Sequence, residues 1–258
     1  MRTVIFGLEF PPIQNLVEWP NWFGPEGSWY GFNKIAFINV IALVATSLLF
    51  LIAGRSKSLV PKGAQNLVES AVDFIREGIV LETMGPDGIK YLPYLVSLFF
   101  FILITNIFEV IPFFHMPANA RMAGPAVLAL LTWAFYIAVG LKHQGPKYFI
   151  NAIAPAGVPK ALLPLVIPIE FLSTFIVRPF SLAVRLFANM LAGHILLVTF
   201  SVLCITLFTA SLLAIVLPLS FAMLVGLTGF EIMVAFLQAY IFTILAAVYI
   251  GSSLHAEH

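Results

Sequence analysis

The chain has 258 residues, of which 61% are apolar and 10% are charged, and its formal net charge is +1. Soluble domains carry about 25% charged residues, and a soluble fold of this size cannot hide so much apolar surface. The composition therefore excludes an ordinary soluble enzyme, a disordered chain and a nucleic-acid-binding protein, and it indicates a polytopic membrane protein. The single cysteine, Cys204, excludes a disulfide framework and a cysteine-based metal site.

The first 34 residues contain no uninterrupted apolar stretch of signal-peptide length and no small-residue cleavage site, so we expect no signal peptide. Trp19, Trp22 and Trp29 in this segment suit a membrane interface, where amphipathic rings settle. The alternative is a short exposed tail whose aromatic residues occur by chance.

Three segments approach the length of about 20 apolar residues that a membrane-crossing helix needs. They are 35–53 and two segments, 93–114 and 125–141, that form a pair within 92–141. The region 54–91 differs, because its apolar residues recur at helical spacing while charged residues occupy the other side. It predicts an amphipathic helix on the membrane surface, or a soluble cap on the same side.

The last part of the chain, 161–258, is apolar over nearly its whole length. From Ala161 to Leu254 only Glu170, Arg178, Arg185 and Glu231 are charged. One weak interruption near 204–211 would leave two helices of about 60–70 Å each, against a hydrocarbon layer of about 30 Å. Each helix must therefore split into two ordinary spans or be strongly tilted, and length and prolines alone favour splitting.

The distribution of Lys and Arg predicts the orientation in the membrane. Region 54–91 carries five of these residues and region 142–160 carries three, whereas the loops on the other side carry only Arg2, Lys34 and Arg121. We therefore expect 54–91 and the loop 142–160 to face the cytoplasm. The N-terminal segment 1–34 is then external, and a terminal hairpin returns the C-terminus to the cytoplasm.

Ionisable residues inside apolar helices are costly to bury and are candidates for function. Arg185 lies far from any interface, and because arginine keeps its proton it needs an anion nearby. The nearest acid in the chain is Glu170, so a structural Arg185–Glu170 pair is the alternative to a functional role. Small and polar residues, among them Asn189, surround Arg185 on its helix face, whereas His194 falls on the opposite side.

Glu231 and Gln238 are seven residues apart and share one face of the last helix. With His194, whose proton exchanges near neutral pH, and Asn189 they have the composition of an intramembrane proton relay. The alternatives are a hydrogen-bonded core histidine for His194 and helix–helix packing for Gln238. No motif for nucleotide binding or hydrolysis is present, so the sequence predicts no cofactor, no metal site and no enzyme activity of the chain on its own.

Three motifs carry a resemblance to a known family. The run from Pro179 to His194, PFSLAVRLFANMLAGH, resembles the signature of subunit a of F-type ATP synthase. The run 237–242, LQAYIF, resembles the second signature of the family, and 106–112, NIFEVIP, resembles an earlier segment on the third helix. The resemblance covers the chain from about residue 35 to its end.

The resemblance implies an all-α polytopic fold of about five membrane helices plus one amphipathic surface helix. Its last two helices would form a long, tilted, membrane-embedded hairpin, contrary to the splitting that length alone favours. The subunit would be a stator that passes protons to and from a rotating ring of c subunits through two offset half-channels. The implied proton-translocation residues are Arg185, His194, Glu231, Gln238, Asn189, Glu170 and Glu109.

Within that set the resemblance implies separate roles. Arg185 would face the ionised carboxylate of the ring and separate the half-channels, while His194 and Glu231 would be relay positions. Glu170 matches an acid near the cytoplasmic exit, and Glu109 matches an acidic position near the outer side.

The implied partners are the c-subunit ring, the peripheral-stalk b subunits, the remaining ATP synthase subunits and the lipid bilayer, with no nucleic acid. The implied location is a bacterial plasma membrane. The alternative function is a proton-coupled secondary transporter, which usually shows two related halves. No repeat relates 35–141 to 161–254.

Overall fold

The computed structural model describes residues 4–5, 8–9, 20–25, 31–55, 63–111, 118–153, 162–208 and 215–254. Trp19, Trp29 and most of the expected N-terminal segment lie outside these ranges, as do 56–62 and the end of the expected loop 142–160. The only strands described are the antiparallel pair β1 (Val4–Ile5) and β2 (Leu8–Glu9). The remaining elements are helical: α2 (Lys34–Arg55), α3 (Ala64–Ile75), η1 (Arg76–Leu81), α4 (Glu82–Met84), η2 (Gly85–Tyr91), α5 (Leu92–Ile107), α6 (Ala123–Gln144), α7 (Lys147–Ile153), α8 (Leu163–Leu172), η3 (Ser173–Val177), α9 (Arg178–Leu207) and α10 (Leu217–Leu254).

Five helical segments in the described ranges are long and apolar enough to cross a membrane. They are Lys34–Leu51, Pro86–Ile107, Ala123–Gln144, Leu163–Leu207 and Leu217–Leu254. This number confirms the expected all-α polytopic membrane fold.

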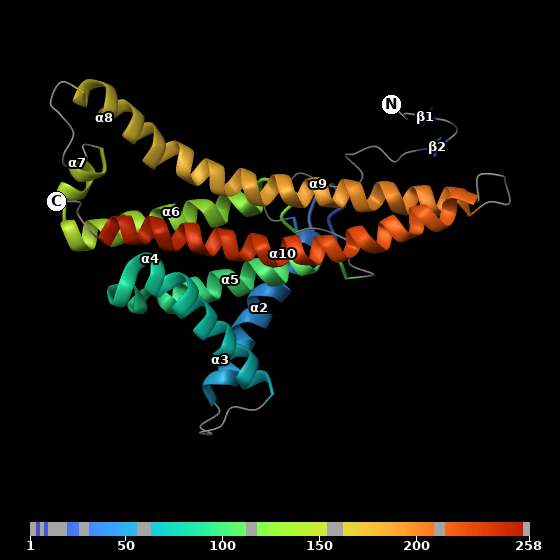
Figure 1. Cartoon of the computed structure of the whole chain (residues 1–258), viewed down its shortest axis with the longest axis horizontal. Helices are drawn as coiled ribbons and strands as arrows, with labels where there is room; N and C mark the ends of the chain where they lie inside the picture. Colours follow the sequence, from blue (N-terminus) through green and yellow to red (C-terminus); the bar gives the residue numbers. More distant parts are fainter. Residues whose placement is uncertain are drawn as a thin grey trace.

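The last two of these segments form a long hairpin (Figure 1). The first is one helical rod of 45 residues made of α8, η3 and α9, and the second is the 38-residue helix α10. Splitting into shorter spans, which length and prolines favour, is therefore wrong. Pro164 and Pro179 stand in the first turns of α8 and α9, and the π-helical turn η3 joins these two helices without a break.

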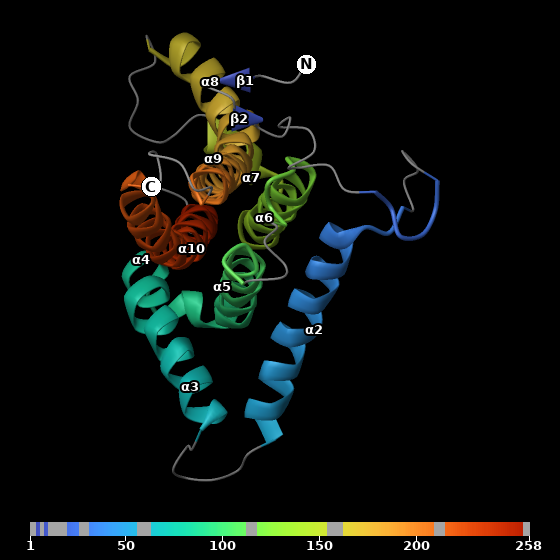
Figure 2. The ribbon, with the colours of Figure 1, turned by 90° about the vertical axis from the view of Figure 1, so that its right-hand side faces the viewer.

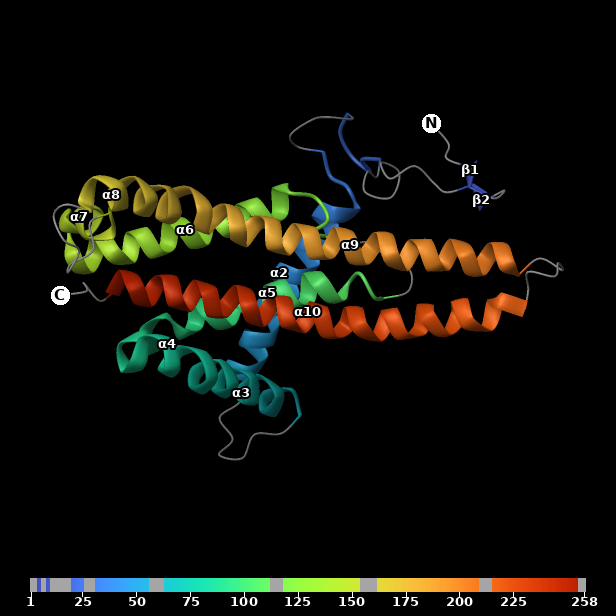
Figure 3. The ribbon, with the colours of Figure 1, turned by 45° about the horizontal axis from the view of Figure 1, so that its top comes forward.

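Helix α10 is the centre of the packing, since it contacts α5, α6 and α9. Seen end-on in Figure 2, these four helices form a bundle, and α2 crosses it at a steep angle on the outside. The outer part of the α9–α10 hairpin extends beyond α5 and α6 (Figure 3). The hairpin therefore has one half packed within the bundle and one half that projects from it.

The amphipathic segment α3–η1 buries the face that its spacing predicts. Val68, Ile75 and Ile79 are buried, whereas Glu69 and Asp73 are exposed. The apolar face packs against α2, α5 and α10. The segment is thus a helix on the outside of the bundle with its charges turned away from it, which agrees with the expected surface helix.

Candidate functional site

A close contact between the two hairpin helices lies at Gly193 on α9. A Cβ atom at this position would lie 2.5 Å from Oε2 and 2.6 Å from Cδ of Glu231 on α10. The carboxyl group of Glu231 therefore rests directly on the α9 backbone, which only a glycine permits. His194 is the next residue on α9, and its side chain is buried, as is that of Glu231.

A second polar contact joins the helices two turns away on α10. Gln238 Nε2 donates a hydrogen bond to the backbone oxygen of Arg185 at 3.3 Å, and the Gln238 side chain is buried. The pairs Gln238–Arg185 and Glu231–Gly193 follow the register of an antiparallel hairpin. Glu231 and Gln238 thus share the face of α10 that their seven-residue spacing predicts, and this face meets α9.

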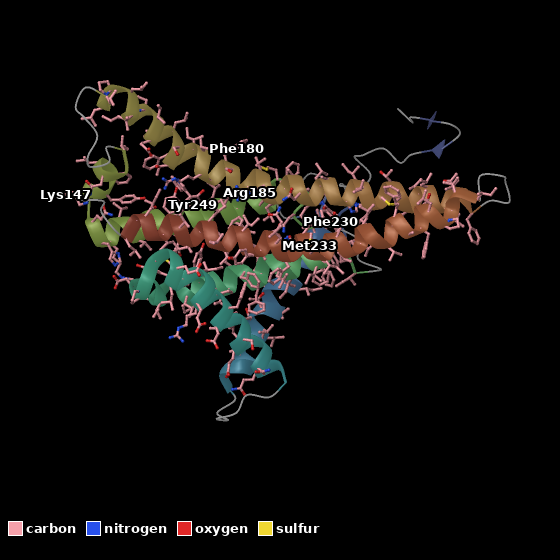
Figure 4. The ribbon with its side chains drawn as sticks, viewed as in Figure 1. Lys147, Phe180, Arg185, Phe230, Met233 and Tyr249 are labelled. Atoms are coloured by element: carbon pink, nitrogen blue, oxygen red, sulfur yellow. The ribbon has the colours of Figure 1, made fainter. Side chains whose placement is uncertain are left out.

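The opposite face of α9 is open among the described residues. Arg185 is half-buried, and Ala188, Asn189 and Ala192 are exposed. Asn189 thus lies on the outer face, while His194 is buried on the inner side, as the nine-residue spacing from Arg185 predicts. Figure 4 shows the Arg185 region of α9 beside α10. This face of small and polar side chains could receive another helix closely.

Glu109 lies in the turn after α5 and is buried. It follows the end of the Pro86–Ile107 span. Burial in the fold and the neighbouring carboxylate of Glu231 raise the pKa of Glu109 to about 8. The carboxyl groups of Glu109 and Glu231 therefore belong to one electrostatic neighbourhood, although they are 122 positions apart in the chain.

A buried polar cluster at the end of α5 adds residues that the sequence interpretation did not single out. Asn119 Nδ2 donates hydrogen bonds to Asn106 Oδ1 at 2.8 Å and to Thr105 Oγ1 at 3.2 Å. All three side chains are buried, and Asn106 is three residues before Glu109. The signal for Asn106 was its place in the same motif as Glu109, whereas no pattern marked Asn119, which precedes α6.

Glu170 lies apart from these contacts. It is half-buried on α8, and the continuous rod to α9 separates it from Arg185 by 15 residues, or about 22 Å along the axis. That separation argues against the structural Arg185–Glu170 pair. The structure thus brings Glu231 to Gly193 and Gln238 to the backbone of Arg185, and it leaves Glu170 near the N-terminal end of the rod.

Among the described residues, no group of three histidine, cysteine, aspartate or glutamate side chains could hold a metal ion. The buried polar groups at the α9–α10 contact can donate, accept or carry protons, which is the chemistry that this arrangement offers.

The family described as ATP synthase A chain matches residues 35–251. The chain belongs to this family. The matched range contains all seven residues that the sequence motifs implicated. Membership of the ATP synthase A chain family confirms the resemblance that rested on the three motifs.

Individual proteins named ATP synthase subunit a are similar over most of the chain. The one from Frankia alni is 42% identical over 257 residues, which are 96% of this chain and 87% of that protein. The one from Rhodococcus erythropolis is 43% identical over 232 residues, covering 88% and 84%. The one from Maricaulis maris is 39% identical over 237 residues, covering 88% and 90%. The family match over residues 35–251 includes both the α9–α10 hairpin and the turn after α5 that carries Glu109.

Proposed function

We propose that this chain is the proton-translocating stator subunit of an F-type ATP synthase, a non-catalytic member of that complex. The observation that carries the proposal is the contact of Glu231 with Gly193, beside His194. The buried side chains of His194 and Glu231, two turns from the contact between Gln238 and Arg185, support the proposal. Family membership and the names of the relatives support the assignment.

A proton enters from the outer side through a half-channel formed by Glu109, His194 and Glu231. It neutralises a carboxylate of the c ring, which then enters lipid at a lower cost than an ion would. After the ring has turned, the carboxylate reaches a second half-channel near Glu170 and releases its proton toward the cytoplasm. The membrane potential contributes about 2.3 kcal/mol per charge per 100 mV.

Arg185 separates the two half-channels. Its guanidinium keeps its charge, so it favours the ionised form of a ring carboxylate and cannot pass a proton on. Asn189 is exposed one turn further on the same helix, so the face that carries Arg185 is available to the ring.

The partners in this proposal are the c ring, the peripheral-stalk b subunits and the remaining ATP synthase subunits. The location is a bacterial plasma membrane with the N-terminus outside and the C-terminus in the cytoplasm. The excess of Lys and Arg in 54–91 and 142–160 supports this orientation.

The test is Arg185→Ala in membranes that contain the whole complex, with Arg76→Ala as the control because Arg76 is exposed on η1, outside the hairpin. We expect Arg185→Ala to abolish proton-driven ATP synthesis while the control synthesises normally. Normal synthesis in Arg185→Ala would refute the role of the arginine. Isolation of the wild-type chain as an active transporter without a c ring would refute the stator assignment as a whole.

A further inference from the structure

The turn η3, between Glu170 and Arg185, has a hydrogen-bond pattern that depends on a proline. The N–H of Arg178 donates to the oxygen of Ser173, five residues earlier, which is the π-helical pattern. The oxygen of Thr174 would then take its bond from residue 179. That residue is Pro179, which has no N–H. The π register therefore leaves the carbonyl of Thr174 without a donor from its own helix.

Tyr136 on α6 supplies that donor. Its hydroxyl donates to the oxygen of Thr174 at 2.8 Å, and both residues are buried. In an uninterrupted α-helix, Arg178 would donate to Thr174 instead, and Pro179 would leave the oxygen of Phe175 without a donor. The two registers thus differ in which carbonyl Pro179 leaves unpaired. Because the Tyr136 hydroxyl bonds the one at Thr174, it favours the π register.

The ring of Tyr136 also takes part in holding Arg178. The ring centroids of Tyr136 and Tyr249 are 5.7 Å apart, and the guanidinium carbon of Arg178 lies 5.1 Å from the centroid of Tyr249. That distance allows a cation–π interaction. Figure 4 labels Tyr249 on α10. The ring of Tyr136 thus packs against Tyr249 on α10, and Tyr249 in turn contacts Arg178, the first residue of α9.

The register decides which side chains line up along the rod. Glu170 and Arg178 are eight residues apart, which in an uninterrupted α-helix corresponds to an angle of about 80° around the axis. A π turn takes up one extra residue, so the angle falls to roughly 20°. Arg185 follows Arg178 by seven residues, again at roughly 20°. The π register therefore sets Glu170, Arg178 and Arg185 in one row, and all three are half-buried.

We infer that Tyr136 is a positioning residue, whose hydroxyl holds η3 in the π register and thereby aligns Glu170 with Arg178 and Arg185. This inference rests on the proposed function, in which Glu170 receives protons released by the ring. Loss of the hydroxyl leaves a buried carbonyl without its donor and favours the α register. Glu170 then turns by about 100° away from the row.

The first experiment measures passive proton conduction. Membrane vesicles that carry the complex, stripped of its soluble ATPase subunits, are given a potassium diffusion potential, and proton uptake is recorded. Tyr136→Phe should lower the rate about 10-fold, while the chain still co-purifies with the c ring in normal amounts. Tyr94→Phe is the matched control, because it removes a hydroxyl that contacts Thr132 Oγ1 at 3.0 Å and leaves η3 untouched.

The second experiment moves the carboxylate by one position. Phe171 is seven residues before Arg178, so it occupies the row when the turn is α-helical. The exchange Glu170→Phe with Phe171→Glu should lower conduction in the otherwise native chain. In the Tyr136→Phe chain the same exchange should restore conduction. A purely structural role of Tyr136 predicts no such recovery, so failure to recover overturns the inference.

Glu170→Gln separates the inference from the proposed function. If Glu170→Gln conducts normally, the proposed role of Glu170 fails and the inference fails with it. If Glu170→Gln is impaired while Tyr136→Phe conducts like the native chain, the inference alone is wrong. Impairment of both, with normal conduction by Tyr94→Phe and recovery through the exchange, establishes Tyr136 as a positioning residue.

Discussion

The contact between Gly193 and Glu231 predicts what a single methyl group would do. In Gly193→Ala the new Cβ would meet Oε2 of Glu231 at 2.5 Å, whereas ordinary contact begins near 3.4 Å. The carboxyl group must therefore withdraw by about 0.9 Å. Since Glu231 can move the end of its side chain, we expect the fold to survive and the carboxyl group to be displaced.

A displacement of about 1 Å at a site that depends on geometry can cost roughly 100-fold in rate. We expect Gly193→Ala to lower passive proton conduction about 10- to 100-fold, equivalent to about 1.4–2.7 kcal/mol in the activation free energy. The assay is proton uptake into stripped vesicles under a potassium diffusion potential, with the amount of assembled complex measured in parallel.

Two further variants test whether the displaced carboxyl group is the cause of the loss. Gly78→Ala is the control, because a Cβ at Gly78 would meet nothing within 4 Å. Gly193→Ala combined with Glu231→Asp shortens the acid by one carbon–carbon bond, about 1.5 Å, and should recover part of the conduction. If Gly193→Ala conducts protons at the native rate with the complex fully assembled, the close contact of the Glu231 carboxyl group with α9 is not required for conduction.

Three other predictions concern the buried polar groups. Exchanging the proposed relay residues, His194→Glu with Glu231→His, should conduct better than either single change, and conduction no better than the worse single variant would refute a shared relay. Asn119→Ala removes the donor to Asn106 Oδ1 and should destabilise the complex by about 1–3 kcal/mol, seen as a lower unfolding temperature in detergent; an unchanged temperature would contradict this. Because the pKa of Glu109 is raised to about 8 from the model-peptide value of 4.5, the folded state binds its proton more tightly, and stability should fall as pH rises from about 5 through 8. Glu109→Gln should flatten that fall, and an equal slope in both proteins would count against it.

Much of the fold follows from apolar length and spacing. The apolar segments 35–53 and 125–141 lie within α2 and α6, and 93–114 overlaps α5, which ends earlier, at Ile107. Apolar runs of this length form helices in lipid because a helix satisfies its own backbone. The amphipathic face of α3 is visible in its spacing for the same reason. The unbroken rod Leu163–Leu207 was not predictable from composition, since Pro164 and Pro179 fit the first turns of helices and α8 continues through Pro168.

The site was predictable only in part. Periodicity places Glu231 and Gln238 on one face and His194 opposite Arg185, and both statements need only the helical repeat. The partner of each group depends on how α9 and α10 align. The alignment of two helices cannot be deduced from the helical repeat of either sequence alone. Asn119 stayed undetected because its place beside Asn106 comes from the approach of two helix ends that no periodic pattern connects.

The length of α10 has a consequence for the geometry of transport. Its 38 residues extend about 57 Å, so within a layer of about 30 Å the helix lies inclined by roughly 60° from the membrane normal. On a helix so inclined, each step along the chain moves a side chain more sideways than downward. Arg185 and His194, nine residues apart on the partner helix, then differ by about 12 Å within the membrane plane and by only about 7 Å in depth. In the proposed complex, spacing along the sequence thus becomes distance around the circumference of the c ring.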